Sequence, residues 1–211
     1  MMERSTDLRA VRSRKLIEQA LTDILSNQGI KELTVKNLAQ KAGINRGTFY
    51  LHYKDIFDLV EQTEWMRGLL EIFEPIRLGD LMKHSDEKSP FPAIAEAFRY
   101  MHRHASIFRA VFHSSAPVEF RERLQYLVGT RLYENLKQDQ PDSSWSVQPA
   151  GYIIAYLGSG QFGLIQHWFM TGRTLSPDEI ALMLTRFIRN SPCLSHHFWS
   201  SDSKKSRIEM T

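Results

Sequence analysis

The sequence predicts an all-α protein, with a small three-helix domain containing a helix-turn-helix at the N-terminal end and a larger helical domain after it. Two observations lead to this prediction. Apolar residues recur at three- and four-residue spacing along most of the 211 residues, while no stretch alternates as a half-buried strand does. Residues that begin or end helices, such as Ser, Thr, Asn, Asp, Gly and Pro, stand between these periodic stretches.

The composition, with 42% apolar and 24% charged residues, is that of a soluble globular protein. Cys193 is the one cysteine, so no internal disulfide can form and a reducing compartment is expected. The N-terminal stretch "MMERSTDLRAVRSRK" is polar and has no apolar core of a secretory signal. We therefore expect a cytoplasmic protein.

Charge is distributed unevenly along the chain. Nine basic and three acidic residues lie between Arg9 and Lys54, whereas the whole chain carries a net charge of only +3. The first quarter is therefore basic and the remainder acidic. A basic domain on an acidic body indicates a polyanionic partner for the first quarter, although a solvated basic face would give the same count.

The first two predicted helices follow from their end signals. An amphipathic helix is expected from Leu8 to Asn27, with Gly29 just past its end. Thr34 is a suitable N-cap for a second helix over Val35–Lys41, which Gly43 closes. The buried stripe of the first helix is expected to contain Ile17, Ala20, Leu21, Ile24 and Leu25.

A tight turn separates the second helix from the third. Asn45 is the expected N-cap of the third helix, which should run to about Tyr53. Phe49 and Tyr53 are four residues apart, so they share one face, which we expect to point inward. Asp55 should cap a fourth helix that extends to Phe73 or beyond.

The rest of the chain is predicted as five helices and two connections. The segment "RLGDLMKHSDEKSPFP" mixes charge, Gly and Pro and is the clearest loop, and "KQDQPDSSWSVQP" is expected to be a linker. Ser176 should cap the last helix. The expected helices are Phe91–His104, Ala105–Phe112, Pro117–Gln138, Pro149–Met170 and Pro177–Asn190. The expected domains are residues 1–54, residues 55–190 and a polar tail, residues 191–211.

A helix pair joined by a glycine-containing turn is a helix-turn-helix, whose second helix enters the major groove of DNA. Arg46 at its start can reach guanine, and Asn45 can pair with adenine or cap the helix instead. Gly47 allows a close backbone approach, and Thr48 can contact a thymine methyl group or a phosphate. Further contacts to the DNA backbone are expected from Thr34, Lys36, Tyr50, His52 and Lys54.

Residues 11–60 resemble the DNA-binding domain of the tetracycline-repressor (TetR/AcrR) family of bacterial transcriptional regulators. The resemblance rests on "LTVKNLAQKAGINRGTFYLHYKD", the amphipathic helix before it, and Gly29. It implies base contacts at residues 45–48 and phosphate contacts by Thr34, Tyr50 and His52. The family usually carries a lysine where this chain has Ile56, so the corresponding backbone contact is either made by Lys54 instead or absent.

The resemblance also implies a homodimer that binds a near-palindromic operator in double-stranded DNA. It implies a repressor released by a small-molecule effector, although a regulator without an effector is an alternative. The aromatic and methionine residues of the middle helices form either plain core or an apolar effector pocket: Trp65, Met66, Phe73, Phe98, Met101, Phe108, Phe112 and Tyr126. The last two helices are expected to pair with their mates through Tyr152, Tyr156, Gly160, Gly163, Trp168, Met183 and Phe187.

Three other interpretations have weaker support. "GSGQFG", Gly158–Gly163, matches a dinucleotide-binding fingerprint, but helical patterns lie on both sides where a strand would be needed; the better interpretation is close packing between helices. Trp145–Gly172 is uncharged, as in a membrane span, yet its Gln, His and Gly content favours a buried interface helix. The histidines lack metal-ligand spacing and no catalytic motif occurs, so we expect no metal, no cofactor and no enzymatic activity.

Overall fold

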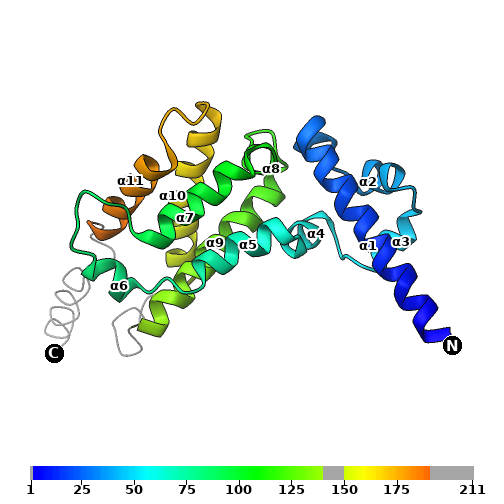
Figure 1. Ribbon diagram of the computed structural model, residues 1–211, viewed down its shortest axis with the longest axis horizontal. Coiled ribbons are helices and arrows are strands. Elements are labelled where there is room, and N and C mark those ends of the chain that lie inside the picture. Colours follow the sequence, from blue (N-terminus) through cyan, green and yellow to red (C-terminus); the bar gives the residue numbers. More distant parts are fainter. Residues whose placement is uncertain (1, 140–149, 191–211) are drawn as a thin grey trace, which may run out of the picture. The chain divides into compact units, whose positions relative to one another are not determined.

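The computed structural model describes residues 2–139 and 150–190, which are helical throughout apart from turns and loops (Figure 1). The predicted all-α class is confirmed. The chain divides into two compact units. The first consists of Met1–Leu70 with Arg103–Arg123, and the second of Glu71–His102 with Leu124–Thr211. The predicted boundary between residues 54 and 55 is a different division and stays a prediction.

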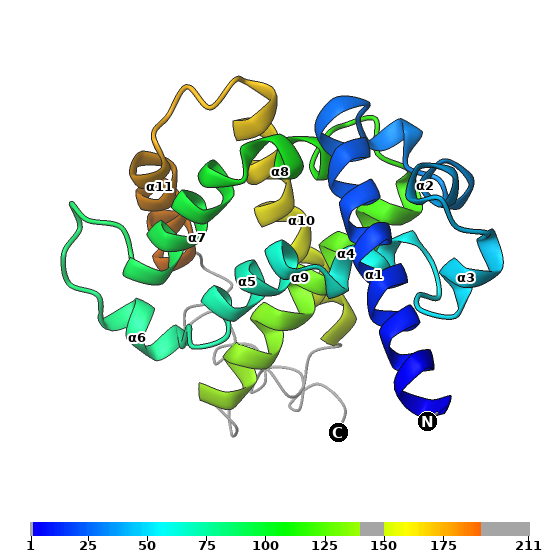
Figure 2. The ribbon, with the colours of Figure 1, turned by 45° about the vertical axis from the view of Figure 1, so that its right-hand side comes forward.

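The first unit begins with α1 (Met2–Asn27), against which α2 (Val35–Ala42) and α3 (Arg46–Tyr50) lie in Figures 1 and 2. A single 3-10 turn, Ile30–Glu32, leads into α2. The helix α1 begins at Met2, not at Leu8 as predicted, because no proline or glycine interrupts the residues before Leu8. All five residues of its predicted stripe, Ile17, Ala20, Leu21, Ile24 and Leu25, are buried.

The turns around α2 take the predicted conformations. Thr34 accepts a hydrogen bond from the Asn37 N–H at 3.1 Å, which satisfies one of the free donors at the start of α2. Gly43 ends α2 with φ +67°, and its N–H donates to the carbonyl oxygens of Ala39 and Gln40. Gly29 likewise has φ +87°, beyond the end of α1. Both glycines occupy backbone conformations that L side chains rarely adopt.

The single helix predicted from Asp55 to Phe73 is two helices, α4 (Ile56–Gln62) and α5 (Glu64–Phe73), so that prediction was wrong. Thr63 separates them with an extended backbone at ψ 151°. Its buried hydroxyl donates to the Val60 carbonyl at 2.7 Å and accepts from the Met66 N–H at 3.4 Å. A threonine that bonds its neighbouring backbone competes with helix continuation, which is why the apolar periodicity alone missed the break.

The second unit contains α6 (Leu78–Lys83), α10 (Ala150–Met170), α11 (Pro177–Arg189) and most of α7 (Pro92–Arg103) and α9 (Val118–Asp139). The last residue of α7 and the first residues of α9 belong to the first unit. The helix α8 (Ala105–Val111) lies wholly in the first unit. The helix α6 lies in the stretch predicted as a loop. Leu81 explains it, since this side chain is 2% exposed and needs a helical turn to reach the core. The predicted linker between α9 and α10 falls mainly on residues outside the described ranges, as does the tail after Asn190.

The end signals of α11 are confirmed. Ser176 accepts from the Glu179 N–H at 3.3 Å, and the Glu179 carboxylate accepts from the Ser176 N–H at 2.8 Å. These two bonds form a capping box, with Pro177 in the first turn. The carboxylate's hydrogen bonds from the Ser176 hydroxyl and N–H lower the pKa of Glu179 below its ordinary value.

Glycines bring α9 and α10 unusually close together. A methyl group on Gly158 would clash with the carbonyl oxygen of Gln125, and would lie 2.9 Å from that carbonyl carbon. A methyl group on Gly129 would clash in the same way with the Ile154 carbonyl oxygen. The predicted close helix packing at Gly158 is therefore confirmed, and Gly129 is its counterpart on the other helix.

Candidate nucleic-acid interface

Asn45, in the turn between α2 and α3, forms the N-cap of α3. The Asn45 side-chain oxygen accepts hydrogen bonds from the Thr48 N–H at 2.7 Å and from the Thr48 hydroxyl at 3.0 Å. Of the two roles that the sequence left open for Asn45, the structure contains the cap. The oxygen that would accept from adenine is thus occupied, while the side-chain amide hydrogens of Asn45 are still available to an acceptor.

Most of the predicted DNA-contacting side chains are exposed, as a binding surface requires. Arg46 and Gly47 open α3, and Thr48 behind them is half-buried. His52 is also half-buried. The exposed members of the predicted set are Thr34, Lys36, Asn45, Arg46, Gly47, Tyr50 and Lys54. These nine residues share the first unit, and their individual roles in DNA binding stay predictions.

Gly47 has a structural reason to be glycine besides a close approach to DNA. A methyl group at this position would lie 3.2 Å from the Asn45 side-chain oxygen, which is the capping atom. That distance is tighter than ordinary contacts between a methyl carbon and an oxygen. A larger residue at position 47 would therefore disturb the cap and, with it, the start of α3.

The inner side of α3 is anchored by aromatic residues, as predicted. Phe49 is fully buried and Tyr53 nearly so, and their ring centroids are 5.7 Å apart. The Tyr53 hydroxyl donates to Glu18 on α1 at 3.2 Å. Burial and the nearby Glu18 carboxylate both raise the pKa of Tyr53, so the hydroxyl stays protonated and keeps this bond.

The helix α3 is shorter than predicted, ending at Tyr50 instead of about Tyr53. The next three residues form a turn in which the His52 and Tyr53 N–H groups both donate to the Phe49 carbonyl at 3.0 Å. Lys54 then leads into the extended N-cap residue Asp55. A chain that must become extended at residue 55 cannot remain helical up to it, and this constraint comes from the following helix.

His52 lines one cavity together with Ala10, Val11 and Arg14 of α1 and is half-buried. Burial, and then the positive charge of Arg14, lower its pKa below the ordinary value of 6.5. The imidazole is therefore neutral at pH 7, so it can donate one N–H to a phosphate without carrying a charge.

Asp55 connects the end of the helix-turn-helix to the beginning of α9. One carboxylate oxygen accepts from the Asp58 N–H at 2.8 Å, and the other accepts from the Arg123 guanidinium at 2.5 Å. Burial by itself raises the pKa of Asp55, but these hydrogen bonds outweigh it and the pKa lies below its ordinary value. The Arg123 guanidinium also lies 4.3 Å from the Phe57 ring centroid. Ile56, where the family usually has lysine, is half-buried at the start of α4.

Leu51 is an exposed apolar residue that the sequence analysis did not consider. It follows α3 directly and is 82% exposed. Its position between two predicted phosphate contacts, Tyr50 and His52, was the available signal.

The eight residues predicted to line an effector pocket are divided between the two units. Trp65, Met66, Phe108 and Phe112 belong to the first unit, and the other four to the second. Seven are buried or half-buried, but Tyr126 is 63% exposed and points out of the core, so its assignment was wrong. Phe73 is the one member that lines a small apolar cavity of about 50 Å³ in the second unit.

The residues predicted at a dimer interface fall into two groups. Tyr152, Tyr156, Gly160, Gly163, Met183 and Phe187 are exposed on α10 and α11. Trp168 is 2% exposed, lies 5.3 Å from the Phe98 ring centroid, and donates its indole N–H to the Leu175 carbonyl at 2.8 Å. Trp168 is therefore a core residue, and its assignment to the interface was wrong.

Three rejected or weaker interpretations can be compared with the structure. Gly158–Gly163 lies inside α10 without the strand and turn that a dinucleotide fingerprint needs. Within residues 2–139 and 150–190, no helix is both long enough and apolar enough to cross a membrane. The same described residues contain no group of three His, Cys, Asp or Glu side chains placed to hold a metal ion.

Two family models match the chain. Residues 17–63 match the model described as "Bacterial regulatory proteins, tetR family", and residues 88–190 match the model described as "Transcriptional regulator C-terminal region". The chain is 28% identical over 95 residues to the uncharacterized HTH-type transcriptional regulator YxbF of Bacillus subtilis (strain 168). That match covers 44% of this chain and 24% of the relative, so the chain spans about a quarter of the length of this curated relative.

Three regulators are among the solved structures that match the chain. The dihydroxyacetone kinase operon activator DhaS has 18% identity and a TM-score of 0.47, covering 84% of this chain and 92% of DhaS. The TetR family repressor AlkX from Dietzia sp. has 16% identity and a TM-score of 0.45, covering 86% and 94%. The fatty acid degradation regulator FadR from Bacillus halodurans has 12% identity and a TM-score of 0.43, covering 85% and 95%.

Proposed function

Since the chain belongs to the TetR family of DNA-binding transcriptional regulators, we propose that it acts as a homodimeric repressor that a small molecule releases from a near-palindromic operator. In this proposal the start of α3 reads bases, with Arg46 at a guanine edge. The two flanking groups, Thr34 with Lys36 on one side and Tyr50, His52 and Lys54 on the other, bind phosphates.

One observation carries this assignment of bases and phosphates. Asn45 caps α3 and leaves Arg46 exposed at its first helical position, while Phe49 and Tyr53 fix the opposite side of the helix in the core. A recognition helix needs both properties, because a side chain can select a base only if its own helix is held in place.

Selection of bound duplexes from a pool of random sequences identifies the operator directly. We expect two inverted half-sites whose centres lie about 34–36 Å apart, since each head of a dimer reads one major groove on the same side of the DNA. Enrichment of a single half-site would contradict the dimeric part of the proposal, and the absence of any enriched sequence would contradict specific recognition.

Arg46→Ala tests base reading. We expect it to weaken operator binding by about 1–3 kcal/mol and to relax the preference at one base position. The matched control is Arg131→Ala, which removes the same charge from an exposed site on α9 in the second unit. Fluorescence anisotropy with operator and scrambled duplexes measures both variants. An equal loss on both duplexes would make Arg46 a phosphate contact.

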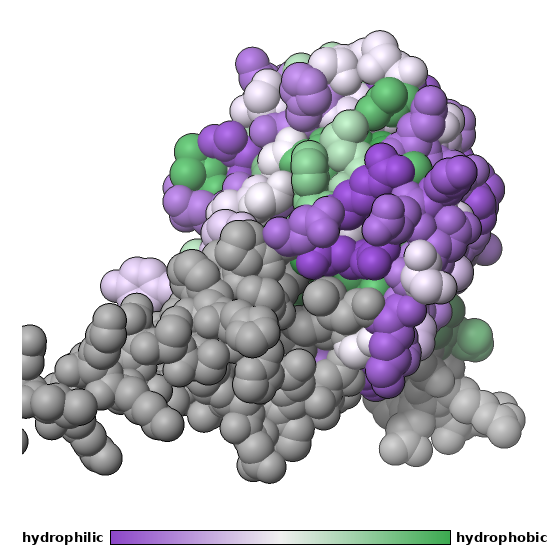
Figure 3. All heavy atoms as spheres, turned by 90° about the vertical axis from the view of Figure 1, so that its left-hand side faces the viewer, coloured by the Kyte–Doolittle hydropathy of each residue, from purple (hydrophilic) through white to green (hydrophobic). Residues whose placement is uncertain are grey.

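Dimerisation is supported by the apolar surface that the second unit leaves uncovered. Tyr152 is 78% and Phe187 58% exposed, and a methyl group added at position 160 or 163 would meet no atom within 4 Å. An apolar groove lies between α10 and α11, lined by Tyr156, Leu164 and Phe187 among others. Figure 3 looks onto the side that carries α6 and α11 in Figure 1, where apolar side chains form a patch among polar ones. Exposed apolar patches rimmed by polar side chains are typical of subunit interfaces.

Phe187→Glu tests this interface by placing a charge in its proposed centre. We expect the variant to sediment as a monomer in analytical ultracentrifugation while the wild-type chain sediments as a dimer. Tyr126→Glu is the control, because Tyr126 is an equally exposed aromatic residue on α9. A dimeric Phe187→Glu variant, or loss of the dimer in both variants, would contradict the proposed interface.

The effector site is proposed in the second unit, at the small cavity lined by Phe73, Ile76 and Leu132. Its polar lining includes Asn135, which donates to the Phe73 carbonyl at 3.1 Å, and the buried Gln161. About 50 Å³ holds little more than one or two water molecules, so an apolar effector must widen the cavity. A ligand that favours the widened state then shifts the protein toward it.

Leu132→Trp fills this cavity and tests the proposal. After a screen of apolar compounds by operator release, we expect the variant to bind the operator but no longer respond to the compound that releases the wild-type protein. If no compound releases the wild-type protein, the regulator without an effector is favoured. The sign of regulation is tested separately with a reporter gene behind the selected operator, where we expect lower expression when the protein is present.

A further inference from the structure

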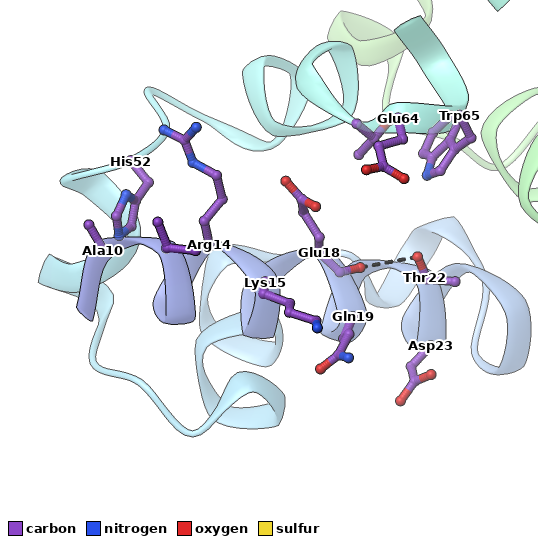
Figure 4. Close-up of a pocket in the computed structure, with 12 residues that line it drawn as sticks. Ala10, Arg14, Lys15, Glu18, Gln19, Thr22, Asp23, His52, Glu64 and Trp65 are labelled. Carbon is purple, nitrogen blue, oxygen red and sulfur yellow. Dashed lines mark hydrogen bonds between the residues drawn. The ribbon is translucent and has the colours of Figure 1, made fainter. Parts of the chain in front are cut away.

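A second cavity, of about 770 Å³, lies in the first unit between α1 and the beginning of α5 (Figure 4). It belongs neither to the exposed start of α3 nor to the small cavity of the second unit. The α1 residues Arg14 and Glu18 line one wall, Thr63, Glu64 and Trp65 line the other, and His52 stands at one end.

Trp65 supplies a hydrogen-bond donor that has no acceptor. The side chain is 8% exposed, and its indole nitrogen has no hydrogen-bond partner among the residues that the structure describes. Its ring packs edge-on against Phe108 with the centroids 5.5 Å apart, which fixes the orientation of the indole. Figure 4 shows the indole nitrogen facing the cavity. A buried donor left unpaired is costly, so this position favours a ligand that brings an acceptor.

Two carboxylates flank the same space. Glu18 points into it from α1 and Glu64 from α5, on opposite walls (Figure 4). One oxygen of Glu18 accepts from the Tyr53 hydroxyl, which leaves its other oxygen available. Neither carboxylate forms an ion pair with a side chain of the described ranges. Two facing carboxylates without a cation between them repel each other, and a protonated amine placed between them would form charge-assisted hydrogen bonds with both.

We propose that this cavity binds a small hydroxylated primary amine, whose ammonium group bonds to Glu18 and Glu64 and whose neighbouring oxygen accepts from the Trp65 indole N–H. The two requirements select this class together. An amine without an oxygen leaves Trp65 unpaired. A neutral polyol leaves the two carboxylates without an ion-pair partner, because Arg14 and Lys15, which also line the cavity, pair with neither among the described residues. The site shares none of its lining with the start of α3 or with the proposed effector cavity, and His52 is its one residue that is also proposed to bind a phosphate.

The experiment observes the indole N–H directly in the full-length chain. The chain contains four tryptophans, so labelling them with ¹⁵N gives up to four indole cross-peaks in a two-dimensional NMR spectrum, and Trp65→Phe identifies the one from Trp65. Three probes are titrated: glucosamine, which has the amine and hydroxyls, glucose, which lacks the amine, and cyclohexylamine, which lacks the hydroxyls. No DNA is needed, so the result does not depend on the proposed repressor function.

We expect glucosamine to shift the Trp65 peak downfield in a saturable way, with glucose and cyclohexylamine binding about 10-fold more weakly or worse. Glu64→Gln should weaken glucosamine binding by about the same factor. Glu71→Gln should not, because this exposed glutamate on α5 does not line the cavity. The remaining indole peaks report whether each variant is folded.

Several results would overturn the proposal. One is a Trp65 peak that does not move with glucosamine, and another is an equal response to all three probes. A third is undiminished binding by a folded Glu64→Gln variant. A shift of the same size with Mg²⁺ alone would assign the two carboxylates to a metal ion and also exclude the amine site.

Discussion

Gly158→Ala adds one methyl group at the closest approach of α9 and α10. The methyl carbon would overlap the Gln125 carbonyl oxygen and lie 2.9 Å from its carbon and 3.2 Å from the Gly129 nitrogen. All three are backbone atoms, so no side chain can rotate away and the two helices must separate. Because both helices are packed in the core of the second unit, their separation also loosens the contacts around the crossing.

The loss of stability expected for Gly158→Ala is the difference between two opposing contributions. Overpacking a well-packed core costs about 1–3 kcal/mol and occasionally more, and a backbone clash lies at the upper end of that range. Alanine in place of glycine inside a helix recovers about 1 kcal/mol. We therefore expect a net loss of about 2 kcal/mol in the free energy of unfolding, which for a chain of this size lowers the Tm by about 4–8 °C.

Thermal and urea unfolding followed by circular dichroism measure this loss. The matched control is Gly151→Ala, in the same helix, where a methyl group meets no atom within 4 Å. We expect the control to be neutral or slightly more stable than the wild type. A Gly158→Ala variant as stable as Gly151→Ala would refute the close approach of the two helices.

A double variant tests whether the clashes at Gly129 and Gly158 are coupled. Gly129→Ala creates the reciprocal overlap, with the Ile154 carbonyl. If both substitutions force the same two helices apart, the separation that accommodates one methyl group also accommodates much of the other. The combined loss should therefore be smaller than the sum of the single losses. Full additivity would indicate that the two clashes are relieved by independent local movements.

Three further predictions follow from the caps and the titrating groups. Asp55→Asn keeps an oxygen to cap α4 but removes the ion pair with Arg123. Because folding lowers the pKa of Asp55, the wild type should lose stability as pH falls below about 3.8. The variant should lose less stability in the same acid titration. Folding also lowers the pKa of His52, so the wild type should lose stability as pH falls from about 6.5 through the lowered pKa. Urea unfolding at each pH should show a weaker dependence of the free energy of unfolding on pH for His52→Gln. The same pH dependence in both proteins would contradict the burial of the imidazole. Ser176→Ala removes the capping box of α11 and should cost about 1 kcal/mol in urea unfolding, a loss that Ser176→Asp should largely restore if the cap is its cause.

The sequence predicted the helix-turn-helix in detail because its signals are local. Thr34, Gly43 and Asn45 act on backbone groups within four residues of themselves, so their effect does not depend on the rest of the fold. The inward positions of Phe49 and Tyr53 follow from helical spacing alone. For the same reason the sequence could predict that Asn45, Arg46 and Gly47 at the start of α3 would be exposed.

Predictions from the sequence were wrong or absent where a side-chain hydrogen bond interrupts a continuous helical pattern, and where two contacting residues lie far apart along the chain. Apolar periodicity continues through Thr63, and only the hydroxyl bonds to Val60 and Met66 show that one helix ends there. Trp168 has the same character as the exposed aromatics of α10, so its burial against Phe98 could not be read from composition. The ion pair between Asp55 and Arg123 joins residues 68 positions apart.

The helical class, the helix caps and the basic helix-turn-helix could all be predicted from the amino-acid sequence, since each depends on interactions within one or two turns of helix. The tertiary structure shows at which glycines a side chain would clash, because the crossing of α9 and α10 leaves no space for a methyl group at Gly158 and Gly129 while Gly160 and Gly163 have no atom within 4 Å. It also decided that Glu18, Glu64 and the Trp65 indole face one cavity. Residues from separate helices form such a site only after the chain has packed, so no spacing along the sequence indicates it.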